Sequence, residues 1–159
     1  MTDAQIYAGA AVMGAVAGMR SMTAPAFVSR LVRSGMPVAG GPLGFLNAPI
    51  AGRTTMLLAA GELIADKLPF LPRRTQAASL IARAVSGAVS GAAVCSAKKR
   101  SVLRGALIGM GAAIGATYAA YELRRRAGAR FGIPDPAIAV IEDAIAAGCG
   151  AFILSRLKA

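Results

Sequence analysis

Four acidic residues of this sequence lie inside apolar stretches, where a carboxylate is costly to bury. Glu62 and Asp66 are one helical turn apart and therefore share a helix face, and Glu142 and Asp143 are adjacent farther along the chain. A charged side chain at mid-membrane is unfavourable by roughly 2.5–3.5 kcal/mol or more unless it is paired or hydrated. We therefore expect these carboxylates to face the interior of a helical bundle, where they could line a path for a cation, a proton or a polar solute.

Three basic residues in or beside the same stretches are candidate counter-charges: Arg20, Lys67 and Arg83. Arg83 shares its helix face with Gly87 and Gly91, whose small size would let a partner carboxylate approach. Two interpretations stay open at this point. In the structural one the cations neutralise the acids and lock the helices together. In the functional one the acids form a transporter or channel-like pathway.

Other chemistry is restricted by what the sequence lacks. It has no His, which excludes Ser–His and Cys–His nucleophilic systems, and its two cysteines, Cys95 and Cys149, have no metal-site or disulfide spacing. We expect neither a bound metal nor a cofactor, and no enzymatic activity. The remaining enzymatic alternative is chemistry on a lipid headgroup, with Glu62 and Asp66 holding a divalent metal.

Composition places these residues in a membrane protein. Hydrophobic residues make up 56% of the 159 positions, charged residues only 16%, and the mean hydropathy is +0.59. The net charge is +11, and the basic residues cluster between long apolar runs, as juxtamembrane cations do. The expected location is the cell membrane, as a multi-pass protein, with the bilayer and its anionic lipids as partners. The sequence has no basic helix or aromatic platform of the kind that binds nucleic acids, so we expect no nucleic-acid partner. A homo-oligomer is left open.

The elements that must position these residues are helices of a single all-α domain over residues 1–159. Thr2 and Gln5 form a capping-box pattern at the start of the chain. Asp135 is predicted to cap the last helix, and Pro136 follows it at the first helical position, where proline is favoured. Residues 25–53 form an irregular basic segment rich in Pro and Gly, with a short interfacial helix. No alternating pattern predicts a strand. The predicted transmembrane bundle has about five helices: residues 4–23, 54–68, 75–97, 101–123 and 136–157.

Glycines recur at a spacing of four in three of these helices, which would let helix backbones pack closely. The pairs are Gly14 and Gly18, Gly87 and Gly91, and Gly105 and Gly109, with Gly111 and Gly115 one face over. The first and fourth predicted helices share a Gly-Ala-x-x-Gly-Met pattern, and each leads to a basic segment and an acid-bearing helix. This predicts an inverted two-helix repeat, in which the first and fourth helices cross in opposite directions. The alternative is chance similarity between Gly- and Ala-rich helices.

Three strings of the sequence resemble a known family. They are GMRSMTAP at 18–25, GELIADKLP at 61–69 followed by Pro72, and Pro134-Asp135-Pro136 followed by Glu142-Asp143. These strings resemble motifs of the bacterial membrane proteins catalogued as domain of unknown function 4126, and the similarity would cover nearly the whole chain. The resemblance implies a small polytopic protein of the bacterial inner membrane and names no activity.

Overall fold

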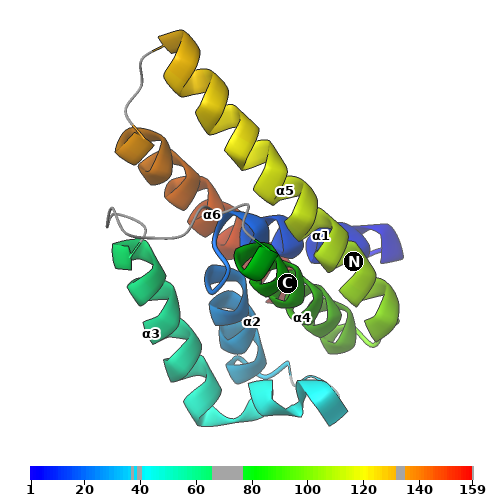
Figure 1. The fold of residues 1–159 in the computed structure, drawn as a ribbon. Coiled ribbons are helices and arrows are strands. Elements are labelled where there is room, and N and C mark those ends of the chain that lie inside the picture. The colour runs from blue at the N-terminus through cyan, green and yellow to red at the C-terminus, as the bar shows by residue number, and fades with distance from the viewer. Residues whose placement is uncertain (37, 39–40, 66–76, 132–134, 159) are drawn as a thin grey trace.

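The chain folds almost entirely into helices in the computed structural model (Figure 1). The structure describes residues 1–36, 38, 41–65, 77–131 and 135–158, and no strand occurs among them. The prediction of an all-helical fold is confirmed for these residues. Their helices are α1 (Asp3–Met19), α2 (Thr23–Arg33), the 3₁₀ helix η1 (Gly41–Asn47), α3 (Pro49–Ala65), α4 (Ala77–Ala97), α5 (Val102–Phe131) and α6 (Asp135–Lys158).

One α-helix in the N-terminal part of the chain, α2, is additional to the five predicted transmembrane helices and corresponds to the short helix predicted within residues 25–53. α1 begins at the predicted capping box, in which the Thr2 side chain accepts from the Gln5 N–H and the Gln5 side chain accepts from the Thr2 N–H. It ends at Met19, about a turn earlier than predicted, because Arg20 has an extended backbone. The segment predicted to be irregular contains α2, η1 and the start of α3. Pro25 stands in the first turn of α2, where a missing N–H costs nothing.

The three later helices follow the prediction more closely, and all three are long and apolar enough to cross a membrane. α4 ends at Ala97 as predicted, and α6 agrees with its predicted range to within one residue at each end. α5 differs because it continues past the predicted end at residue 123 to Phe131, which makes its 30 residues about 45 Å long. The predicted helix start at Thr75 and the predicted helix end at residues 66–68 lie outside the described residues.

The outer surface of the fold is apolar, whereas α1 lies in its interior. Many large apolar side chains are exposed, among them Ile81 and Val85 of α4, Leu103, Leu107 and Leu123 of α5, and Val140, Ile141 and Phe152 of α6. A water-soluble domain would bury such side chains, but lipid solvates them well. Ala10, Val16 and Ala17 of α1 are fully buried. The arrangement therefore fits a bilayer around α4, α5 and α6.

The glycine-rich faces of α1, α4 and α5 pack against one another. A Cβ added at Gly87 of α4 would lie 2.6 Å from both the Ala113 Cβ and the Gly109 carbonyl oxygen of α5. Only a residue without a Cβ permits this approach of the two backbones. The second glycine face of α5 has no such role, because a Cβ at Gly111 or Gly115 would meet nothing within 4 Å among the described residues.

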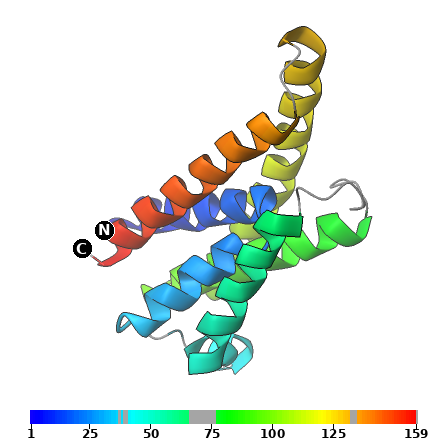
Figure 2. The ribbon, with the colours of Figure 1, turned by 90° about the vertical axis from the view of Figure 1, so that its left-hand side faces the viewer.

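The same contacts give the directions of the helices. Gly14 lies against Gly109 and Gly18 lies against Ala113, so α1 and α5 run in the same direction. The prediction that these two helices cross in opposite directions is wrong, because the additional helix α2 reverses the chain once more before α5. α4 is antiparallel to both helices. α6 is antiparallel to α1, so that the two ends of the chain lie close together (Figure 2).

Candidate functional site

A sharp reversal of the chain inside the fold gathers most of the buried charge. α1 ends at Met19, residues 20–22 turn the chain, and α2 folds back beside α1 (Figure 2). Met13 of α1 and Leu31 of α2 consequently line the same small cavity. We call residues 18–22 the α1–α2 corner. Reversing a chain here exposes the last carbonyls of one helix and the first N–H groups of the next, and each needs a partner.

Side chains of α4 and α5 satisfy the carbonyl side of the α1–α2 corner. Arg83 is buried, and its Nη1 donates to the carbonyl oxygens of Gly18 at 2.6 Å and Met19 at 2.8 Å. A cation at this position also interacts favourably with the negative end of the α1 dipole. The Thr117 hydroxyl shares its proton between the same Gly18 oxygen, at 3.0 Å, and the Ala113 carbonyl oxygen of its own helix, at 2.8 Å, and the Ser86 hydroxyl donates to the carbonyl of Ser21.

Glu62 of α3 satisfies the N–H side of the corner. Its carboxylate accepts from the backbone N–H of Ser21 at 2.8 Å, from the Ser21 hydroxyl at 2.7 Å and from the backbone N–H of Met22 at 2.9 Å. An anion at the start of α2 is stabilised by the helix dipole as well as by these hydrogen bonds. The Arg83 Nη2 lies 4.0 Å from the same carboxylate, so one ion pair joins the two helix ends.

The two adjacent acids of α6 bind arginines in different parts of the fold, one in the turn after α1 and one in α5. Arg20, which is only 1% exposed, donates from Nε and Nη2 to Asp143 at 2.5 Å. Glu142 points to α5 instead, where it accepts two hydrogen bonds from Arg124, at 2.7 Å from Nε and 2.5 Å from Nη2. Two neighbouring residues can do this because they are rotated by about 100° on a helix. α6 is thereby fixed to both α1 and α5.

The predicted site residues are thus brought together only in part. Glu62, Asp143, Arg20 and Arg83 all lie at the α1–α2 corner, although the sequence did not predict their pairing. Glu142 is bound elsewhere, by Arg124, which the sequence analysis had placed after the end of its helix. Asp66 and Lys67 lie outside the described residues. The side chain of Asp135 also lies outside them; α6 begins at Asp135, one residue before the predicted start, and the capping role of Asp135 stays a prediction.

The sequence analysis does not single out two polar partners on α5, Thr117 and Arg124. Thr117 and Arg124 are seven residues apart on α5 and therefore lie on one face, two turns apart. Extending the predicted fourth helix through the arginines would have revealed this polar stripe. Ser86 lies one turn beyond Arg83 on the same face of α4, and both side chains reach the α1–α2 corner. Among the described residues, no group of three or more His, Cys, Asp and Glu is placed to hold a metal.

The opposite end of the molecule carries positive charge with little to balance it. The start of α1 meets the turn between α4 and α5, where Arg100 pairs with Asp3 at 2.5 Å, and the end of α6 lies beside the start of α1. α2 ends and α3 begins at this same end, where the Arg33 side chain lies against Gly52. Within the described part of the chain, Asp3 is the one acid there. We call its cations the basic end: Arg30, Arg33, Arg53, Lys98, Lys99, Arg100, Arg104, Arg156 and Lys158.

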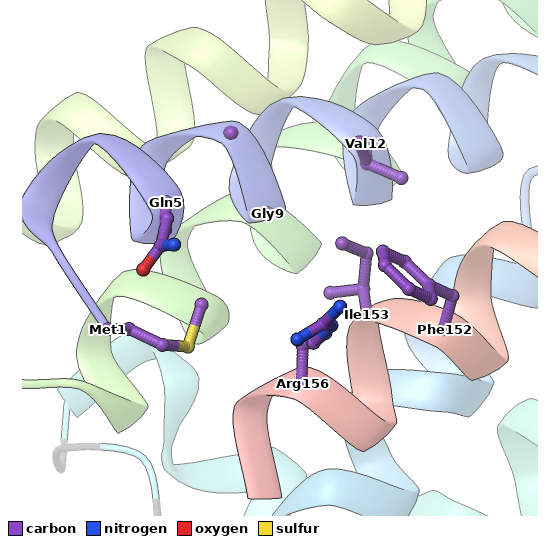
Figure 3. Close-up of a pocket in the computed structure, with 8 residues that line it drawn as sticks. Met1, Gln5, Gly9, Val12, Phe152, Ile153 and Arg156 are labelled. Atoms are coloured by element: carbon purple, nitrogen blue, oxygen red, sulfur yellow. The ribbon is translucent and has the colours of Figure 1, made fainter. Parts of the chain in front are cut away.

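Three surface grooves open near the basic end, and each combines apolar walls with arginine. The largest, about 500 Å³, lies between α1 and α6 and includes Arg156 (Figure 3). A second, about 390 Å³, lies between α1 and α5 and includes Arg104. The third, about 300 Å³, lies between α2 and α3 and includes Arg30 and Arg33. An apolar groove with a cation at its mouth is chemically suited to an amphiphile with an anionic head.

Comparison with known proteins identifies the family without adding an activity. The sequence matches the family described as domain of unknown function (DUF4126) over residues 7–155, and the chain belongs to this family. The predicted resemblance is therefore confirmed. No curated protein and no solved structure matches the chain.

Proposed function

We propose that this member of the family is a multi-pass protein of the cell membrane that binds anionic lipids through its basic end and has no catalytic role. The observation that supports this proposal most directly is the separation of charge. At the α1–α2 corner and along α6, the described acids Glu62, Glu142 and Asp143 are met by Arg83, Arg124 and Arg20. At the basic end the cations far outnumber the described acids.

Unbalanced cations at a membrane surface attract anionic headgroups. Each Lys or Arg near an anionic leaflet contributes about 1 kcal/mol of attraction, so a cluster of this size gives a strong preference for one leaflet. The apolar walls of the three grooves would hold acyl chains beside these cations. The proposal does not require a second copy of the chain, and a homo-oligomer remains a prediction.

Transport is a second candidate, and one observation favours it. The end of α1 and the start of α2 meet inside the fold and are surrounded by charged side chains, as at the discontinuous helices of many transporters. A cation or proton pathway would require the carboxylates there to exchange partners. Glu62 already accepts three hydrogen bonds from the turn, and Asp143 binds Arg20. This closed bonding supports a structural role for the acids.

Native mass spectrometry of the protein purified in detergent tests the lipid proposal. Supplied with equal amounts of phosphatidylglycerol and phosphatidylcholine, the protein should retain phosphatidylglycerol preferentially, and added salt should weaken the preference. Neutralising three cations of the basic end should reduce it more than neutralising three at the opposite end. The two sets of Gln substitutions are Arg30, Lys98 and Lys99, against the matched control Arg125, Arg126 and Arg130. Equal retention of both lipids by the unmodified protein would contradict the proposal.

Proton flux into liposomes tests the transport candidate. Vesicles that contain the protein and a pH-sensitive dye should acidify no faster than empty vesicles if the acids are structural. Glu62→Gln and Glu142→Gln should then lower the stability of the purified protein without changing the flux. A flux above that of empty vesicles that either substitution abolishes would instead support transport. Potassium flux into the same vesicles, measured with a potassium-sensitive dye, tests the cation pathway.

A further inference from the structure

We infer that the groove between α1 and α6 is a specific site for one anionic phospholipid, with Arg156 as the ligand of its phosphate. This inference rests on the proposed function and assigns it a site. The groove has a volume of about 500 Å³, within the range of small-molecule sites in proteins. It runs along two antiparallel helices, so one end lies at the basic end and the other lies toward the apolar middle of the fold.

The walls of the groove divide into a polar and an apolar part. Gln5 of α1 and Arg156 of α6 are the polar residues of the lining, and the Arg156 side chain lies beside Ile153 and Phe152 (Figure 3). Val12, Phe152 and Ile153 supply apolar walls on the two helices (Figure 3). A phospholipid has the same division, because its charged phosphate is attached to acyl chains that avoid water.

Arg156 lacks a carboxylate partner among the described residues. Its guanidinium lies over the ring of Phe152, 5.2 Å from the ring centroid, which fixes its position without neutralising its charge. Asp3, the nearby acid, is already paired with Arg100 at 2.5 Å. An arginine held in this way presents a planar set of donors that suits the oxygens of a phosphate.

The position of the groove argues for a lipid as the occupant. Phe152 is 55% exposed and lies on the same helix as the exposed side chains Val140, Ile141 and Ile145. A helix with this surface is surrounded by lipid in a bilayer, so acyl chains reach the groove without leaving the membrane. The small residues Ala8 and Gly9 on the facing helix leave the space that an acyl chain would fill.

Two substitutions test the site through different properties. Arg156→Gln removes the charge, and Ala8→Phe fills the apolar part while leaving the charge in place. Each should weaken the binding of the tightest phosphatidylglycerol adduct seen by native mass spectrometry about tenfold or more. Arg156→Gln removes a charge-assisted hydrogen bond, and Ala8→Phe removes the space for an acyl chain. The matched controls are Arg130→Gln, at the end of α5 away from the basic end, and Ala119→Phe, on the exposed surface of α5. Both controls should retain the adduct.

The outcomes separate this inference from the proposed function. If the unmodified protein prefers phosphatidylglycerol but Arg156→Gln and Ala8→Phe bind it as well as the controls do, the site is wrong and the general proposal stands. If the unmodified protein shows no preference, both fail. Protection of the protein against thermal unfolding by inorganic phosphate alone, equal to that by phosphatidylglycerol, would also overturn the inference, because the acyl chains would then contribute nothing.

Discussion

Replacing Gly87 by Ala should destabilise the protein, whereas replacing Gly111 by Ala should not. A Cβ at Gly87 would lie 2.6 Å from the Ala113 Cβ, and ordinary van der Waals contact begins at 3.4 Å, so α4 and α5 would have to separate by about 0.8 Å. Overpacking of this kind costs about 1–3 kcal/mol. Ala in place of Gly also gains about 0.5–1 kcal/mol in a helix interior, and Gly111→Ala should show that gain alone.

The difference between the two variants isolates the steric cost, because both make the same chemical change in a helix. Equilibrium unfolding of both proteins in the same mixed micelles should therefore give free energies of unfolding that differ by about 1–3 kcal/mol. Far-ultraviolet circular dichroism should show equal helix content before unfolding. If Gly87→Ala is as stable as Gly111→Ala, then a Cβ at Gly87 does not force α4 and α5 apart. That result would refute the claim that the glycine face permits their close packing.

Three further predictions concern the charged and polar groups. Glu142→Gln should lower the free energy of unfolding by roughly 3 kcal/mol, the low end for a broken buried ion pair, since Arg124 is 15% exposed. Adding Arg124→Gln should cost less than the sum of the two single effects, and strict additivity would argue against the pair. Thr117→Val removes a hydrogen bond to the last turn of α1 and should cost about 1 kcal/mol in the same assay, whereas Thr117→Ser should be near neutral. A membrane-impermeant maleimide should label a cysteine at Lys98 from the cytoplasmic side and one at Arg130 from the other side, because basic ends face the cytoplasm; equal labelling of both from either side would indicate dual insertion.

The sequence predicts the kind of fold well, because composition and glycine spacing are local properties of each helix. It fails at the reversal after α1, because the signals there are not local. Pro25 predicts a helix break close to residue 24, but the helix ends at Met19, where Arg83 and Glu62 satisfy the exposed backbone groups. Those two side chains come from α4 and α3, so no pattern near Met19 reports them.

The sequence predicts which charged residues are buried better than it predicts which of them form ion pairs with each other. The cost of burying charge is enough to select Arg20, Glu62, Arg83 and Asp143 from the sequence, since each lies in or beside an apolar run. Which cation meets which acid depends on helix directions, and the additional helix α2 changed those directions. Arg124 was missed for a related reason: three successive arginines favour a loop at a membrane boundary, yet α5 continues through them.

The contrast between the charges inside the fold and those at the basic end suggests where a ligand would bind. Inside the fold, the charges of the α1–α2 corner and α6 are balanced by neighbours, and their hydrogen bonds hold five helices in place. Such groups gain little from an external ligand, because binding one would first require breaking these bonds. At the basic end, Asp3 pairs with Arg100, and the described acids leave most of the other cations without a neutralising carboxylate. We therefore propose that anionic lipid headgroups balance these cations and that the arginine-lined grooves hold them.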